Sequence, residues 1–245
     1  MFRTAPKETA DDRPRRIVKR VSGYLALACL TALIYVAALV ATMPANALRD
    51  FVTIPPQVTA LYGTIWHGRA ELTGGYAVDW DNIPTDLIML RGTVAATVQG
   101  ADTQLRGTVR VTPWSASVHN LTGRAGAGLL RLVPGLLIEN CTTQAVVDVT
   151  RLALARTWAA AEGQVDVGAG DCMETNGRTN PVPALALTLG TVGRDATAVL
   201  KTGDVTLADV TVSGDHRLSV TVQPEGSALV PGLPTGAPIM IEYPF

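Results

Sequence analysis

The chain has 245 residues, of which 47% are hydrophobic and only 17% are charged, and its formal net charge is −1. Basic residues are concentrated in residues 1–20, so the longer remainder carries a net negative charge. This balance excludes a basic face for binding nucleic acid. The length that remains after the N-terminal region is enough for one extended domain or two small ones.

An uncharged apolar run follows the basic tail of residues 1–20. It extends from Val21 to Met43 and contains no proline. As a helix it would be roughly 34 Å long, which exceeds a hydrocarbon core of about 30 Å. The sequence therefore predicts one transmembrane helix over 21–43. The flanking basic cluster predicts a cytoplasmic N-terminus and a periplasmic C-terminal domain at a bacterial inner membrane.

Two other roles for this run are less consistent with its length. Ala45-Asn46-Ala47 has the small-x-small form of a signal-peptidase site, but the apolar run is longer than the 7–15 residues of a usual signal peptide. Cys29 follows Ala28, as in a lipoprotein site, yet the apolar run continues well beyond it. Pro44 ends the helix, and Pro55-Pro56 predicts a stiff extended linker over 44–57.

Residues 58–245 have the texture of a β domain. Short alternating segments rich in valine and threonine are separated by polar, glycine-containing turns, which predicts antiparallel hairpins. We expect a mainly β meander, folded as a sandwich or a curved open sheet. Recurring L-x-G-T-V segments suggest two similar sheets, over 58–123 and 143–245, and Gly128–Val133 predicts one short helix.

A compact motif stands near the start of this β domain. Residues 63–70 read GTIWHGRA, and a second tryptophan follows at Trp80. Glycines permit close backbone approach and tryptophan supplies a large contact area, so these residues suit either a core or a contact with a partner or lipid. The residues of the motif are Gly63, Thr64, Trp66, Gly68, Ala70 and Trp80.

This motif resembles the signature of the type II secretion system protein N family. The order of basic tail, single span and β-rich domain is also similar to that family. The resemblance implies an accessory or scaffold component of the type II protein secretion machinery, with inner-membrane platform subunits as partners. A looser resemblance to AsmA-like inner-membrane proteins implies the alternative of a β groove that binds or transfers lipid.

Cysteine usage and catalytic motifs complete the sequence-based expectations. Cys141 and Cys172 are the two thiols beyond the apolar run. They would pair in an oxidising compartment, or stay as two separate small hydrophobic residues. No P-loop, nucleophile elbow or metal-ligating spacing occurs among the histidines and carboxylates. We expect a protein without enzymatic activity, metal or cofactor.

Overall fold

The computed structural model describes residues 13–50, 55–82, 86, 91–132, 138–174, 177–228, 234 and 236–245. Residues 1–12 of the predicted basic tail lie outside the described residues. The chain divides into two compact units, Met1–Met43 and Pro44–Phe245.

The first unit contains a single helix in its described part. Helix α1 extends from Arg13 to Ala41 and covers most of the apolar run. Over the part of the chain that the structure describes, no helix is both long and apolar enough to cross a membrane. The transmembrane helix predicted for Val21–Met43 is therefore not supported by the structure.

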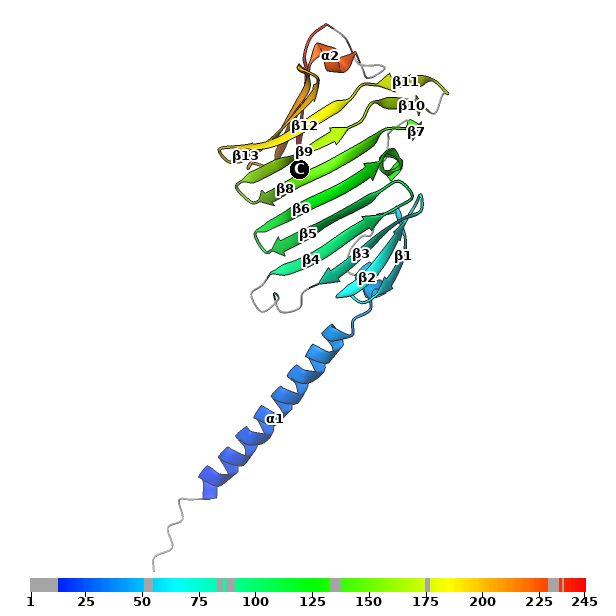
Figure 1. Ribbon diagram of the computed structural model, residues 1–245. Helices are drawn as coiled ribbons and strands as arrows, with labels where there is room; N and C mark the ends of the chain where they lie inside the picture. The colour runs from blue at the N-terminus through cyan, green and yellow to red at the C-terminus, as the bar shows by residue number, and fades with distance from the viewer. Residues whose placement is uncertain are drawn as a thin grey trace, which may run out of the picture. The chain divides into compact units, whose positions relative to one another are not determined.

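The second unit is built on one large antiparallel sheet (Figure 1). Its order is β1-β2-β3-β4-β5-β6-β8-β9-β12-β13-β14-β15-β16, so the chain adds strands in sequence from one edge to the other. The strands of this sheet are β1 (Val58–Gly63), β2 (His67–Leu72), β3 (Tyr76–Asn82), β4 (Gly92–Gln99), β5 (Gln104–Thr112), β6 (Ser115–Gly126), β8 (Gln144–Ala155), β9 (Ala159–Val167), β12 (Leu185–Val192), β13 (Asp195–Thr202), β14 (Val205–Val212), β15 (Arg217–Val222) and β16 (Ile239–Pro244).

Two excursions leave the large sheet and form a smaller one. Strand β7 (Ile138–Cys141) lies between β6 and β8 in sequence, and β10 (Gly170–Glu174) and β11 (Thr179–Val182) lie between β9 and β12. They pair in the order β11-β10-β7. Figure 1 shows this small sheet at one border of the large sheet, opposite the border formed by the β5–β6, β8–β9 and β12–β13 turns.

The mainly β antiparallel class is confirmed, and the structure decides between the two predicted architectures. The large sheet is open and curved, and the smaller three-stranded sheet lies at one of its borders (Figure 1). The stretches 58–123 and 143–245 are not two similar sheets, because β6 pairs with β8 along most of its length and joins them. The continuous pairing of β6 with β8 therefore places both stretches in one sheet, although they contain similar sequence segments.

Two predicted local features also differ. The segment 44–57 is not simply an extended linker, because Ala45–Asp50 forms the 3₁₀ helix η1, Ala45 is fully buried and Pro44 bridges to Thr64. The predicted helix over 128–133 is the 3₁₀ helix η3 (Ala127–Leu132), and Val133 lies outside the described residues. A short α-helix, α2 (Pro224–Ser227), follows β15.

Buried side chains are few and small. Most buried apolar residues of the described sheet are alanines, such as Ala153, Ala159 and Ala161 on β8 and β9, with Val149 and Leu207 among the larger ones. Over most of its described area the large sheet has no opposing layer of side chains, so these small residues are covered mainly by their immediate neighbours. The sheet therefore keeps much apolar surface accessible.

Candidate interaction surface

Cross-strand register gives the large sheet one apolar face. Residues paired across an antiparallel ladder lie on the same face. Along β6 and β8 the pairs Val118–Leu152 and Ala116–Leu154 are apolar, and Leu152 continues to Ala161 of β9. The following residues, which we call the apolar face, share this side: Val94, Val98, Leu105, Val109, Ala116, Val118, Leu121, Val147, Val149, Leu152, Leu154, Ala161, Val165, Leu187, Leu189, Ala198, Leu200, Val210, Val212 and Val220.

The opposite face carries the polar and charged residues. On β6 and β8, His119 stands opposite Arg151 and Thr122 opposite Asp148. Burial lowers the pKa of His119, and the nearby positive charges of Arg110 and Arg151 lower it further. This face is suited to solvent rather than to a second layer.

Two β-bulges keep the apolar residues on one side. Alternation would put Val118 and Leu121 on opposite faces, because they are separated by an odd number of positions. The ladder skips Asn120, whose φ is 51°, so Val118 and Leu121 both face the apolar side. Thr150 is skipped in the same way on β8, between Val149 and Arg151. Bulges also bend and twist a sheet, so the same two positions favour curvature.

The apolar face is concave where the sheet bends. A hollow of about 350 Å³ is lined by Val109 of β5, Leu152 of β8, Leu189 of β12 and Val210 and Val212 of β14. Strands this far apart in the sheet order can bound one hollow only if the sheet curves toward that face. The hollow has the size range and lining of a site for an apolar ligand.

A second apolar hollow lies where the small sheet and α2 cover the same face. Its volume is about 300 Å³, and Leu185, Leu200 and Val222 form its floor. Residues 180–183, from β11 and beyond, and Gly226 of α2 close its sides. The small sheet and α2 thus cover part of the apolar face at this border.

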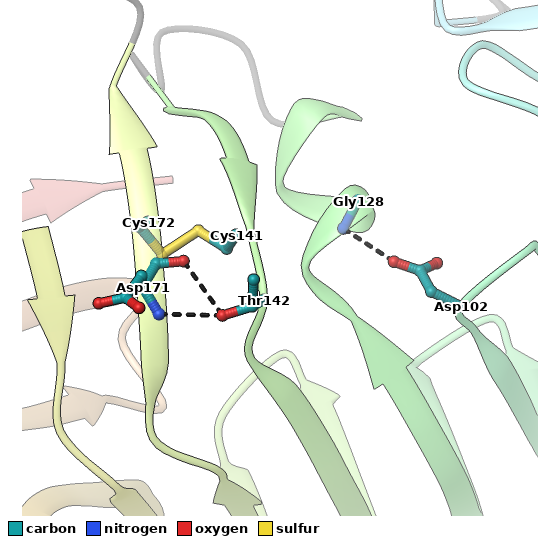
Figure 2. Close-up of a disulfide and its surroundings, with 6 residues drawn as sticks. All are labelled: Asp102, Gly128, Cys141, Thr142, Asp171 and Cys172. Atoms are coloured by element: carbon teal, nitrogen blue, oxygen red, sulfur yellow. Dashed lines mark hydrogen bonds between the residues drawn. A yellow bond between two sulfur atoms is a disulfide. The ribbon is translucent and has the colours of Figure 1, made fainter. Parts of the chain in front are cut away.

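The two cysteines hold the small sheet together. Cys141 of β7 and Cys172 of β10 are register partners and form a disulfide, with their Cα atoms 4.1 Å apart (Figure 2). Beside it, the Thr142 amide donates to the Asp171 carbonyl at 3.0 Å, and the Thr142 hydroxyl accepts a hydrogen bond from the Asp171 amide at 3.0 Å. The bridge closes a loop of 31 residues, worth about 3–4 kcal/mol in the chain-entropy model.

Asp102 fixes the loop elements at the same border. Its carboxylate accepts hydrogen bonds from the Tyr76 hydroxyl at 2.8 Å, the Thr103 hydroxyl at 3.0 Å and the Gly128 amide at 3.2 Å. Burial alone raises the pKa of Asp102, but the hydrogen bonds from Tyr76, Gly128 and Thr103 outweigh it and the pKa is lowered. Figure 2 shows the hydrogen bond from the Gly128 amide to Asp102, which joins η3 to the β4–β5 turn.

The predicted motif builds the β1–β2 turn. Gly63 has φ 85°, and the Thr64 hydroxyl accepts hydrogen bonds from the Trp66 and His67 amides, both at 3.2 Å. Gly63 and Gly68 are register partners. This arrangement assigns the glycines and Thr64 to turn formation.

The rest of the motif packs on the neighbouring strand. Gly68 stands opposite Trp80, and the indole lies so close to it that no Cβ would fit. Ala70 is buried beside them. On the other face, His67 Nε2 lies 3.0 Å from Asp81 Oδ1, and both side chains are exposed, so this contact contributes little to stability. Among the residues that the structure describes, no group of three or more His, Cys, Asp or Glu side chains could hold a metal ion.

Comparison with known proteins decides the family. The family model for the type II secretion system (T2SS), protein N, matches residues 56–230. The chain belongs to this family. The match starts just before β1 and ends beyond α2, so it covers the large sheet except β16 and includes the disulfide. No curated protein and no solved structure matches the chain.

Membership of the protein N family involves the chain in type II secretion and makes other subunits of that machinery its expected class of partner. Sequence reasoning found the motif and the cysteines. It missed the apolar face and the position of Trp114 and Trp158, because both depend on register and strand order. The alternation of apolar residues within β5, β6 and β8 was the only available signal.

Proposed function

We propose that the chain is an accessory scaffold subunit of the type II secretion machinery, anchored in the bacterial inner membrane by Val21–Met43. The family match over residues 56–230 carries this proposal. The apolar run and the preceding basic residues support an anchor with its N-terminus in the cytoplasm and the β unit in the periplasm. The subunit would act through protein contacts and not through catalysis.

The outer edge of β16 is the contact surface that we assign to a partner subunit. Strand β16 ends the sheet order, whereas η1 packs against β1 at the other edge. The Phe245 amide donates to the His216 carbonyl on the β15 side at 3.0 Å. Because amide directions alternate along a strand, the amides of Met240 and Glu242 point away from β15. Pro244, on the same outward side, limits the edge by presenting no donor.

Copurification from the native membrane tests this assignment. We expect the full-length tagged chain to recover identified inner-membrane platform subunits of the secretion machinery. Met240→Pro removes an outward N–H and keeps the β15 ladder, so it should reduce this recovery at least tenfold. Met240→Thr is the matched control, because it changes the side chain and keeps the N–H. Equal recovery with both variants would refute the edge contact, and no platform subunit with the wild type would refute the scaffold.

Membrane orientation has its own test. A reporter that is active only in the periplasm, fused after Phe245, should be active in cells. Activity of a cytosol-specific reporter at the same position would contradict the proposed topology. Release of the chain from membranes by carbonate would contradict the anchor.

Lipid binding is a second candidate function, favoured by the apolar hollow of about 350 Å³. Native mass spectrometry of the full chain would detect bound phospholipid. Leu189→Glu places a charge on the apolar face, whereas Thr188→Glu places it on the opposite face. The first variant should lose bound lipid and the second should retain it. Equal lipid in both variants, or none in the wild type, would exclude this function.

A further inference from the structure

Aromatic side chains gather at one end of the large sheet. All four tryptophans of the chain are there, although they come from different hairpins. Trp66 is in the β1–β2 turn, Trp80 is near the end of β3, Trp114 is in the β5–β6 turn and Trp158 is in the β8–β9 turn. Tyr243 and Phe245 end the chain at the same border, because Phe245 bonds to His216 in the β14–β15 turn. We call this border the aromatic rim.

The opposite border has a different character. Tyr76 lies at this border, but it is buried and its hydroxyl donates a hydrogen bond to Asp102. The small sheet, the disulfide and α2 occupy that border. A folding core would not require tryptophans from separate parts of the chain to be placed at one end, because most buried apolar residues of the sheet are alanines.

Several side chains of the aromatic rim are accessible. Trp114 is 64% exposed, Tyr243 is 64% exposed and Phe245 is 51% exposed. Arginines accompany the tryptophans: the Arg156 guanidinium lies 5.0 Å from the Trp114 ring centroid, and that of Arg151 lies 5.3 Å from the Trp158 ring. Exposed indoles beside arginine are typical of residues at the level of lipid headgroups.

The chain also enters the second unit at this border. Pro44 is the first residue of the unit and bridges to Thr64 in the β1–β2 turn. The apolar run 21–43 ends immediately before it. If a bilayer holds this run, the chain therefore leaves it immediately before the rim end of the sheet.

We propose that the aromatic rim rests on the surface of the bilayer, with Trp114 among the headgroups. The partner is a phospholipid surface and not a protein. A polar hollow at the rim is lined by two arginines and two aspartates: Arg156, Arg194, Asp195 and Asp215. Because these charges balance, the rim has no preference for anionic lipid, and a zwitterionic bilayer is sufficient. This inference rests on the proposed anchor, and it adds an orientation that the anchor alone does not fix.

Tryptophan fluorescence tests the rim directly, because the apolar run contains no tryptophan. The full chain is placed in phosphatidylcholine nanodiscs, either unlabelled or brominated on acyl carbons close to the headgroup. We expect emission to be at least 30% lower in the brominated discs, with little dependence on salt. Trp114→Phe should remove a large share of this quenching.

A relocated tryptophan is the matched control. Val205 is exposed at the start of β14, next to the β13–β14 turn at the opposite border. Trp114→Phe combined with Val205→Trp keeps the number of tryptophans and should not restore the quenching. Equal emission in both discs, quenching unaffected by Trp114→Phe, or full restoration by Val205→Trp would overturn the rim contact. A chain that does not elute with the discs would overturn the anchor as well, so the two failures are distinguishable.

Discussion

The indole of Trp80 lies across the backbone of Gly68 on the neighbouring strand, at a pair of register positions. A Cβ at Gly68 would also stand 2.6 Å from the Tyr62 carbonyl oxygen. The second glycine of the family motif is therefore explained by packing between β1, β2 and β3, and it supports the edge of the sheet where the chain enters.

Gly68→Ala is expected to destabilise the sheet by about 1–3 kcal/mol, because the indole must move to admit a methyl group. Denaturant unfolding of the full chain in detergent measures this. Gly92→Ala is the control, since its nearest contact would be the Val111 carbonyl oxygen at 3.9 Å. If Gly92→Ala lowered the free energy of unfolding as much as Gly68→Ala, the loss of a glycine, and not the Trp80 contact, would be responsible.

Asp102→Asn should cost about 1–3 kcal/mol at neutral pH, because the carboxylate's charge-assisted hydrogen bonds are weakened. The sign of the pH effect follows from the lowered pKa of Asp102. Its contribution is present above the unfolded value of about 3.9 and is lost as the pH falls through the lower folded value. Wild-type stability should thus decline below about pH 4, and this decline should be smaller in the variant.

His119 should make the sheet sensitive to pH in a higher range. Its pKa is lowered in the folded state, so the unfolded chain takes up the proton first as the pH falls below about 6.5. The free energy of unfolding should therefore decrease from about pH 7 to pH 5. His119→Gln should flatten the curve in this interval without changing it below pH 4. An identical curve for the variant would contradict this assignment.

Removing the disulfide should cost about 3–4 kcal/mol if the chain-entropy model holds. The double variant Cys141→Ser, Cys172→Ser should lose hydrogen-exchange protection in β7, β10 and β11, while β4, β5 and β6 keep theirs. Cys29→Ser is the control, because Cys29 is a free exposed cysteine of α1. Uniform loss of protection across the large sheet would show that the bridge stabilises the whole unit.

Much of this protein could be predicted from residue pattern alone. Short alternating segments with glycine turns predicted an antiparallel meander, because hairpins form between neighbours in sequence. The motif around Trp66 predicted the family through its resemblance to the family signature. These features depend on residues that are close together in the sequence, so they could be predicted without the tertiary structure.

Tertiary structure alone decided which side chains share a face and which turns share a border. Alternation puts Val118 and Leu121 on opposite faces, and the bulge at Asn120 reverses that result only because β5 and β8 fix the register. Trp66, Trp114 and Trp158 are distant in sequence, and strand order brings them to one rim. Both outcomes depend on backbone hydrogen bonds between strands, which no single segment determines by itself.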